Sequence, residues 1–170
     1  GICIVQHIPA HFSRTFADRL NQISQVSVKE AEEGDIVSPG HAYVAPGGHH
    51  MMARWIGSRH VIRLNDGPLI HHQRPAVDVM FDSVVKTGSA RYTLATILTG
   101  MGADGAEGLA KLKADGALTA AQDQESCVVY GMPREAAKLN APMHVLPLDQ
   151  MAGFISTHAP QAFAHAPVEA

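Results

Sequence analysis

Residues 92–114 read YTLATILTGMGADGAEGLAKLKA, and this stretch decides the class of fold that we expect. The apolar run from Tyr92 to Leu98 predicts a strand, and a helix is predicted from Ala106 to Ala114, where Asp115-Gly116 closes it. The glycine-rich loop from Thr99 to Gly105 joins the two. A strand that passes through a short loop into a helix is the repeating unit of α/β proteins, so we predict an α/β fold.

The rest of the chain alternates in the same way. Between Val26 and Leu64 the apolar period is two, which predicts strands and hairpins separated by glycine turns. Pro75 is expected at the first position of a helix that runs to Lys86. Further strands are predicted at 1–6, 26–28, 42–45, 61–64, 117–121, 128–130 and 143–146, and further helices at 12–23, 133–139 and 148–158.

Composition indicates one globular domain, which we place at residues 1–158, followed by a flexible Ala-, Pro- and His-rich tail at 159–170. The chain has 170 residues, 46% of them hydrophobic, and a formal net charge of −3. This charge and the absence of any Lys/Arg cluster argue against a nucleic-acid partner. No apolar stretch is long enough to span a bilayer, and no secretory signal is present. We therefore expect a cytoplasmic protein without membrane insertion.

Two further features concern thiols and the first residues. Cys3 and Cys127 both lie in apolar runs, which favours buried free thiols over a disulfide. Gly1 to Gln6 is a buried-strand candidate that begins without an initiator methionine. We therefore expect that the domain is incomplete at its N-terminus.

The loop from Thr99 to Gly105 is the strongest candidate site. Ligands of open α/β sheets bind at the carboxyl ends of strands, and glycines there allow backbone N–H groups to approach a developing negative charge. Met101 and its neighbours could thus form part of an oxyanion hole. The structural alternative is that Asp104 only caps the following helix. Phosphate binding is less favoured, because the loop has no lysine.

His7 follows the first predicted strand, and so lies at the sheet edge where site residues collect. A single histidine there is compatible with a catalytic base, although a lone histidine at a strand end is more often a structural or solvated side chain. The adjacent pairs His49-His50 and His71-His72 do not have metal-ligand spacing, because neighbouring side chains point apart in a strand. We therefore expect no metal site.

Two other residues leave alternatives open. Cys127 could be a nucleophile served by His7, but it precedes Val128-Val129, and a buried thiol has a raised pKa that disfavours attack. Arg74 could hold an acidic or amide-bearing substrate through its guanidinium. Alternatively, Arg74 and Asp78 could form an ordinary ion pair at the start of a helix.

Six sequence blocks, in order across nearly the whole chain, resemble the catalytic domain of the chemotaxis methylesterase CheB. They are QHIP at 6–9, EAEEG at 30–34, PGHAYVAPG at 39–47, RPAVDV at 74–79, ILTGMGADG at 97–105 and ESCVVYGMPREA at 125–136. This resemblance implies a doubly wound, mostly parallel α/β sheet with helices on both faces and a β-hairpin insertion.

The resemblance also implies an activity and its residues. The family hydrolyses γ-glutamyl methyl esters on methyl-accepting chemotaxis receptors, and some members deamidate receptor glutamines, without a cofactor. Its triad histidine matches His7, its aspartate matches Asp104, and the methionine that donates a backbone N–H to the oxyanion matches Met101.

The family's nucleophile has no match in this sequence. It is a serine in a Gly-x-Ser-Thr-Gly-Gly turn before the histidine strand, and no such turn is present. A regulatory receiver domain, present in most members, is also not found. We therefore expect this chain alone to be inactive. The alternative is a non-catalytic receptor-binding module of the same fold.

Overall fold

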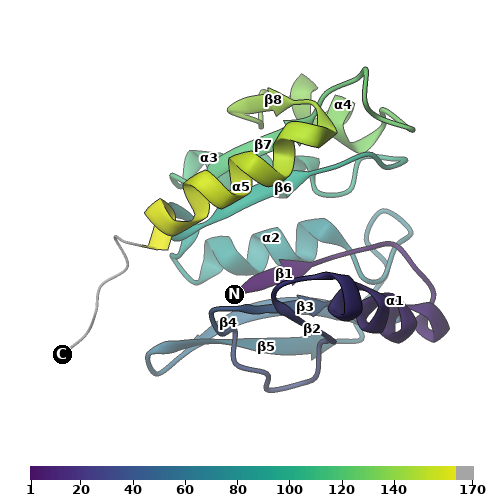
Figure 1. Cartoon of the computed structure of the whole chain (residues 1–170), viewed down its shortest axis with the longest axis vertical. Helices are drawn as coiled ribbons and strands as arrows, with labels where there is room; N and C mark the ends of the chain where they lie inside the picture. Colours follow the sequence, from purple (N-terminus) through teal and green to yellow (C-terminus); the bar gives the residue numbers. More distant parts are fainter. Residues whose placement is uncertain (164–170) are drawn as a thin grey trace. The chain divides into compact units, whose positions relative to one another are not determined.

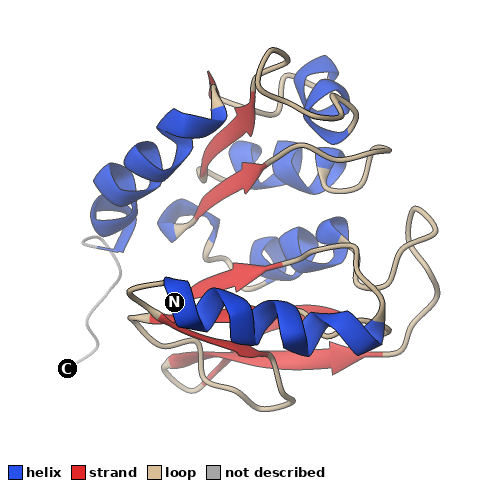
Figure 2. Ribbon diagram, turned by 45° about the vertical axis from the view of Figure 1, so that its right-hand side comes forward, coloured by secondary structure: helices blue, strands red, loops and turns tan. Residues whose placement is uncertain are grey.

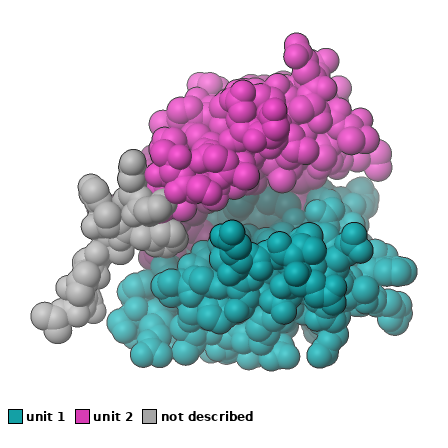
Figure 3. Space-filling view, in the orientation of Figure 1, with its two compact units in different colours: residues 1–83 teal, residues 84–170 magenta. Residues whose placement is uncertain are grey.

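A computed structural model describes residues 1–163 of the chain, with side chains described up to residue 159 (Figure 1). Its elements follow the alternating order that the sequence predicts, from β1 at the N-terminus to α5 at the end of the described residues (Figure 2). The chain divides into two compact units, residues 1–83 and 84–170, which are coloured separately in Figure 3. Each unit contains its own three-stranded parallel sheet.

In the first unit the sheet has the order β1-β3-β2, with β1 at Ile2–Ile4, β2 at Ser27–Glu30 and β3 at His41–Val44. Helix α1, Ala10–Ile23, packs on this sheet because its apolar positions recur every three or four residues. Its Ala17 meets Val28 and Val44, and all three are buried. Partly buried hydrophobic side chains complete this cluster: Ile4, Phe16, Leu20 and Val26.

An antiparallel hairpin follows the first sheet. Strands β4, His50–Ile56, and β5, Arg59–Asn65, pair along their whole length. Gly57, with a φ of 61°, forms the turn between them, a conformation that glycine adopts without a steric penalty. The hydroxyl of Ser83 on α2, Val77–Lys86, accepts a hydrogen bond of 2.8 Å from the N–H of Ala53, which ties the hairpin to that helix.

The second unit has the sheet order β6-β7-β8, at Leu94–Ile97, Leu118–Gln122 and His144–Leu146. A 3₁₀ turn, η1 at Ala90–Tyr92, precedes β6. Helix α5, Leu148–Phe163, covers one face of the sheet, and helices α3, Ala106–Ala114, and α4, Met132–Lys138, cover the other (Figure 2). Fully buried Leu109 and Leu112 anchor α3 on the sheet.

The sequence predictions for these elements are mostly confirmed, with four corrections. Residues 128–130 form no strand; Tyr130 makes one isolated bridge with Gly100, and the side chain of Val128 is 91% exposed. Strand β4 was not predicted as a separate strand. Helix α2 begins at Val77, two residues after Pro75, and α5 continues to Phe163 rather than ending at residue 158. The last seven residues of the expected tail lie outside the described residues.

Among the described residues, no helix is both long and apolar enough to cross a bilayer.

Candidate active site

His7 lies just after the carboxyl end of β1, on the wall of a cavity in the first unit. The half-buried imidazole shares this cavity, of about 320 Å³, with residues from two loops: Ile8, Pro9, Leu69, His72, Gln73 and Arg74. The structure thus brings two of the predicted site residues, His7 and Arg74, into one cavity. Four of its seven lining residues, His7, His72, Gln73 and Arg74, have polar side chains.

The loop that carries His7 is fixed by backbone hydrogen bonds on both sides. The N–H of Ala45 donates to the carbonyl of Ile4 at 2.8 Å, and the N–H of Ile8 donates to the carbonyl of Gln6 at 2.9 Å. Buried Ser13 on α1 accepts a hydrogen bond of 3.0 Å from the N–H of Gly47 and donates to a carboxylate oxygen of Glu30 at 2.5 Å. These bonds hold the elements on either side of the segment that carries His7, β1 and α1.

Arg74 does not form the helix-end ion pair that was considered as an alternative. One of its terminal nitrogens, Nη1, donates to the carbonyls of Asp66 and Gly67 at 2.8 Å each. Its Nε is buried and has no hydrogen-bond partner among the described residues. Since guanidinium groups bind carboxylates and amides through several N–H donors, Arg74 retains donor capacity beside the cavity.

A tight turn brings His72 to the cavity, whereas the sequence named this residue only as part of the pair His71-His72, which lacks metal-ligand spacing. Ile70 and Gln73 exchange backbone hydrogen bonds of 3.1 and 2.8 Å, and the two residues between them, His71 and His72, have φ values of 50° and 61°. Positive φ at both central residues is the signature of a type I′ turn, in which Asn-Gly is usual. Two histidines in this conformation store backbone strain.

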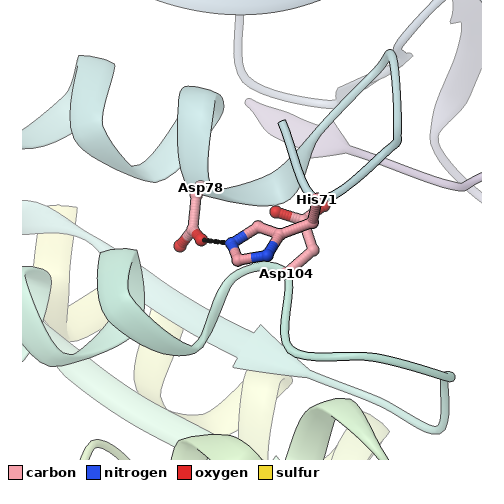
Figure 4. A group of neighbouring side chains, drawn as sticks. All are labelled: His71, Asp78 and Asp104. Atoms are coloured by element: carbon pink, nitrogen blue, oxygen red, sulfur yellow. Dashed lines mark hydrogen bonds and ion pairs between the residues drawn. The ribbon is translucent and has the colours of Figure 1, made fainter. Parts of the chain in front are cut away.

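The neighbouring His71 points to a different partner. Its Nε2 lies 2.9 Å from a carboxylate oxygen of Asp78, which is buried at the start of α2 (Figure 4). This pair ties the turn to the helix. Asp78, which the sequence offered as a partner of Arg74, therefore pairs with His71 instead.

The other predicted site residues, Met101 and Asp104, lie in the second unit, in the loop between β6 and α3. Asp104 is only 1% exposed, whereas the side chain of Met101 is 83% exposed. Gly102 and Gly105 have φ values of 93° and 86°, so the loop depends on the freedom of glycine at both positions. The N-cap of α3 is Gly105, so the alternative in which Asp104 occupies the capping position is wrong.

The two cysteines are free, as predicted, but Cys127 lies in a loop rather than in a buried strand. Burial raises the pKa of both thiols, that of Cys3 to about 11. A raised pKa leaves little thiolate for attack near neutral pH.

Two histidines outside the cavity, His50 and His49, have partners in the structure. Fully enclosed His50 contacts the carbonyl of Pro68 through Nε2 at 2.9 Å and accepts the N–H of Ala76 at 3.2 Å. Its two bonds require the tautomer with hydrogen on Nε2. His49 pairs with the carboxylate of Asp66.

Comparison with known proteins settles the family. The chain matches the family described as CheB methylesterase over residues 1–155. The chain belongs to the CheB methylesterase family. This match includes His7, Arg74, Met101 and Asp104, so every predicted site residue lies within the part of the chain that is common to the family.

Individual relatives agree with this assignment. The chain is 51% identical over 89% of its length to a protein-glutamate methylesterase/protein-glutamine glutaminase 2 of Syntrophus aciditrophicus and 48% identical over 89% to the enzyme of Escherichia coli K12. It covers 44% and 43% of these two relatives, so it spans less than half of their length.

A solved structure also matches. The crystal structure of the Thermotoga maritima CheB methylesterase catalytic domain is 36% identical, with a TM-score of 0.84, and the match covers 96% of this chain and 82% of that one. The doubly wound α/β fold that the sequence blocks imply is therefore confirmed.

Proposed function

We propose that this chain is the larger part of a catalytic domain that hydrolyses γ-glutamyl methyl esters on methyl-accepting chemotaxis receptors. The observation that carries the proposal is the family match over residues 1–155, combined with a histidine on a cavity wall after β1 and a buried aspartate after β6. Both residues follow the carboxyl ends of parallel strands, where sites of α/β proteins are built.

His7 is the proposed general base, and Asp104 is proposed to orient it. In this mechanism the hydroxyl of the family's serine loses its proton to His7 as its oxygen attacks the ester carbonyl. The carboxylate of Asp104 fixes the imidazole tautomer and stabilises the cation that forms. The proton then passes from His7 to the departing methoxide, so that methanol leaves and an acyl-serine remains.

Water completes the cycle by the same route. His7 takes a proton from water as the oxygen of the water attacks the acyl-serine, and it returns that proton to the serine oxygen as the carboxylic acid product leaves; the acid then loses its proton to solvent and becomes the carboxylate. In both tetrahedral intermediates the backbone N–H of Met101 is proposed to stabilise the oxyanion. A glutamine side chain can enter the same sequence with ammonia as the leaving group. Deamidation is therefore part of the proposal, in line with the glutaminase named for the relatives.

Arg74 is the proposed substrate-binding residue. It lines the cavity of His7, and a guanidinium binds carboxylates and amides of a substrate polypeptide through its N–H donors. Cytoplasmic location and control by a receiver domain upstream of the catalytic domain are further parts of this proposal.

The test requires a completed domain, defined as residues 1–170 joined to an upstream segment that carries the family's serine turn, from the same gene or from the Syntrophus aciditrophicus relative. We expect this protein to release methanol from a receptor methylated on glutamate, and residues 1–170 alone to release none. Methanol release from residues 1–170 alone would contradict the role of an upstream serine. A completed domain that binds receptor but releases no methanol would instead indicate the non-catalytic binding module.

A further inference from the structure

Gln122, the last residue of β7, is a buried polar side chain that the proposed mechanism does not use. It is 1% exposed, and its amide oxygen Oε1 accepts the backbone N–H of Thr99 at 2.8 Å. Thr99 opens the loop that carries Met101 and Asp104. The amide nitrogen of Gln122, Nε2, donates to the carbonyl of Ser126 at 2.8 Å and to the hydroxyl of Ser126 at 3.2 Å.

The orientation of this amide is determined by its partners. The hydroxyl of Ser126 donates to a carboxylate oxygen of Asp123 at 2.6 Å and accepts the N–H of Leu148 at 3.0 Å. If the amide were reversed, two donors would face each other at Thr99 and two acceptors at the carbonyl of Ser126. The network therefore presents an acceptor, and only an acceptor, to the N–H of Thr99.

The next residue of the loop, Gly100, is held from a second side. Its N–H donates to the carbonyl of Val129 at 3.1 Å, and its carbonyl accepts the N–H groups of Gly131 and Met132 at 3.1 and 2.8 Å. A Cβ at Gly131 would lie 2.5 Å from the carbonyl oxygen of Gly100 and 3.1 Å from the Cα of Met101. In the two residues before Met101, the N–H of Thr99, the N–H of Gly100 and the carbonyl of Gly100 are therefore all hydrogen-bonded.

We propose that Gln122 is a positioning residue for hydrolysis, acting through the backbone of Thr99 and Gly100 on the N–H of Met101. This inference rests on the proposed function, in which that N–H stabilises the oxyanion. Such a donor must lie about 2.7–3.1 Å from the developing oxyanion. Without the acceptor of Gln122, the N–H of Thr99 must find another partner, and the loop shifts to reach it.

The test replaces Gln122 by methionine, which has a similar length and cannot accept the N–H of Thr99 as an amide oxygen does. In the completed domain we expect Gln122→Met to lower kcat about 10–100-fold, less than the 10²–10³-fold loss typical of deleting an oxyanion donor, because the donor is displaced and not removed. KM should change less than about twofold, since an interaction made only in the transition state affects kcat.

Thr119 supplies the matched control. It lies on the same strand, is fully buried, and bonds to the carbonyl of Ala141 at 2.8 Å and to the N–H of Met143 at 3.1 Å, towards β8. Thr119→Val also removes buried hydrogen bonds from β7 but none that reach residues 99–101. We expect it to lower Tm and to leave kcat within about twofold of the wild type.

A second measurement separates this proposal from the proposed function. Amide hydrogen exchange, followed by NMR on residues 1–170, reports the hydrogen bond of Thr99 without any need for activity. We expect Gln122→Met to speed exchange of the Thr99 amide at least about tenfold relative to the amides of β6, and Thr119→Val not to do so. Equal kcat in the two variants, or an unchanged Thr99 amide, would overturn the proposal. An inactive wild-type completed domain with a protected Thr99 amide would refute the proposed activity alone.

Discussion

A Cβ on Gly47 would lie 2.4 Å from the backbone nitrogen of Ala10 and 2.6 Å from the carbonyl carbon of Pro9. The loop after β3 therefore packs directly against the segment that follows His7, at a distance that no side chain permits. The N–H of Gly47 also donates to buried Ser13. The position of His7, the proposed base, thus depends on residue 47 having no Cβ.

Gly47→Ala should destabilise the chain by about 2 kcal/mol, because backbone atoms on both sides would have to move. Gly153→Ala, on α5, is the matched control, since a Cβ there meets nothing within 4 Å. We expect it to stabilise the chain by about 0.5–1 kcal/mol. Urea unfolding of both variants measures the difference, and equal free energies of unfolding would show that the loop contact is not tight.

Asp104→Asn in the completed domain should lower kcat by about 10⁴, as loss of the orienting carboxylate does in serine proteases. Asp115→Asn makes the same change at an exposed position at the end of α3 and should leave kcat within about twofold. Methanol release measures both variants. A nearly normal rate for Asp104→Asn would refute the triad assignment.

Cys127→Ala should keep methanol release within about twofold of the wild type, since burial raises the pKa of the thiol and leaves it poorly nucleophilic. Treatment of the completed domain with a thiol alkylator provides an independent measurement. If the variant were inactive while its Tm was unchanged, the cysteine hydrolase considered from the sequence would become the better mechanism.

His72→Gly should raise the free energy of unfolding by about 0.5–1 kcal/mol, because glycine relieves the strain of a φ of 61° at some cost in chain entropy. The same substitution at His11, in the first turn of helix α1, should lower it slightly, because glycine has a lower helix propensity than histidine. Urea unfolding compares the two. A destabilised His72→Gly variant would mean that contacts of the imidazole outweigh the backbone strain.

His60 should make the chain less stable in mild acid. Burial lowers the pKa of His60, and the positive charge of the N-terminus lowers it further. The centroid of its ring lies 4.6 Å from that of the Trp55 ring. Because the folded pKa is below the unfolded value of 6.5, the unfolded chain binds more protons, and stability falls as the pH drops below about 6.5. Unfolding between pH 7.5 and 5 should show a smaller loss of stability for His60→Gln, and equal losses would contradict this.

Local signals explain which elements the sequence predicted well. Helix α3 has the predicted limits because glycine precedes it and Asp115-Gly116 ends it. Strand β4 was not predicted separately because its buried residues cluster at its N-terminal end and do not alternate. Residues 128–130 have β-forming side chains, but the carbonyl of Val129 bonds to the loop at Gly100 and not to a neighbouring strand.

The candidate site divides in the same way. His7, Arg74, Met101 and Asp104 belong to short motifs, so each could be selected from the sequence. Gln122 and His72 could not, because their roles depend on contacts that no local pattern encodes. Gln122 is 23 positions from the residue whose N–H it accepts, and His72 reaches the cavity through a turn in which histidine is unusual.

The exposure of Met101 has a practical consequence. Its proposed contribution is a backbone amide, whereas its thioether is 83% exposed and points into solvent. The residue is therefore suited to carry a spectroscopic label: a cysteine at this position, coupled to a fluorophore, would retain the amide and report binding of the proposed receptor substrate.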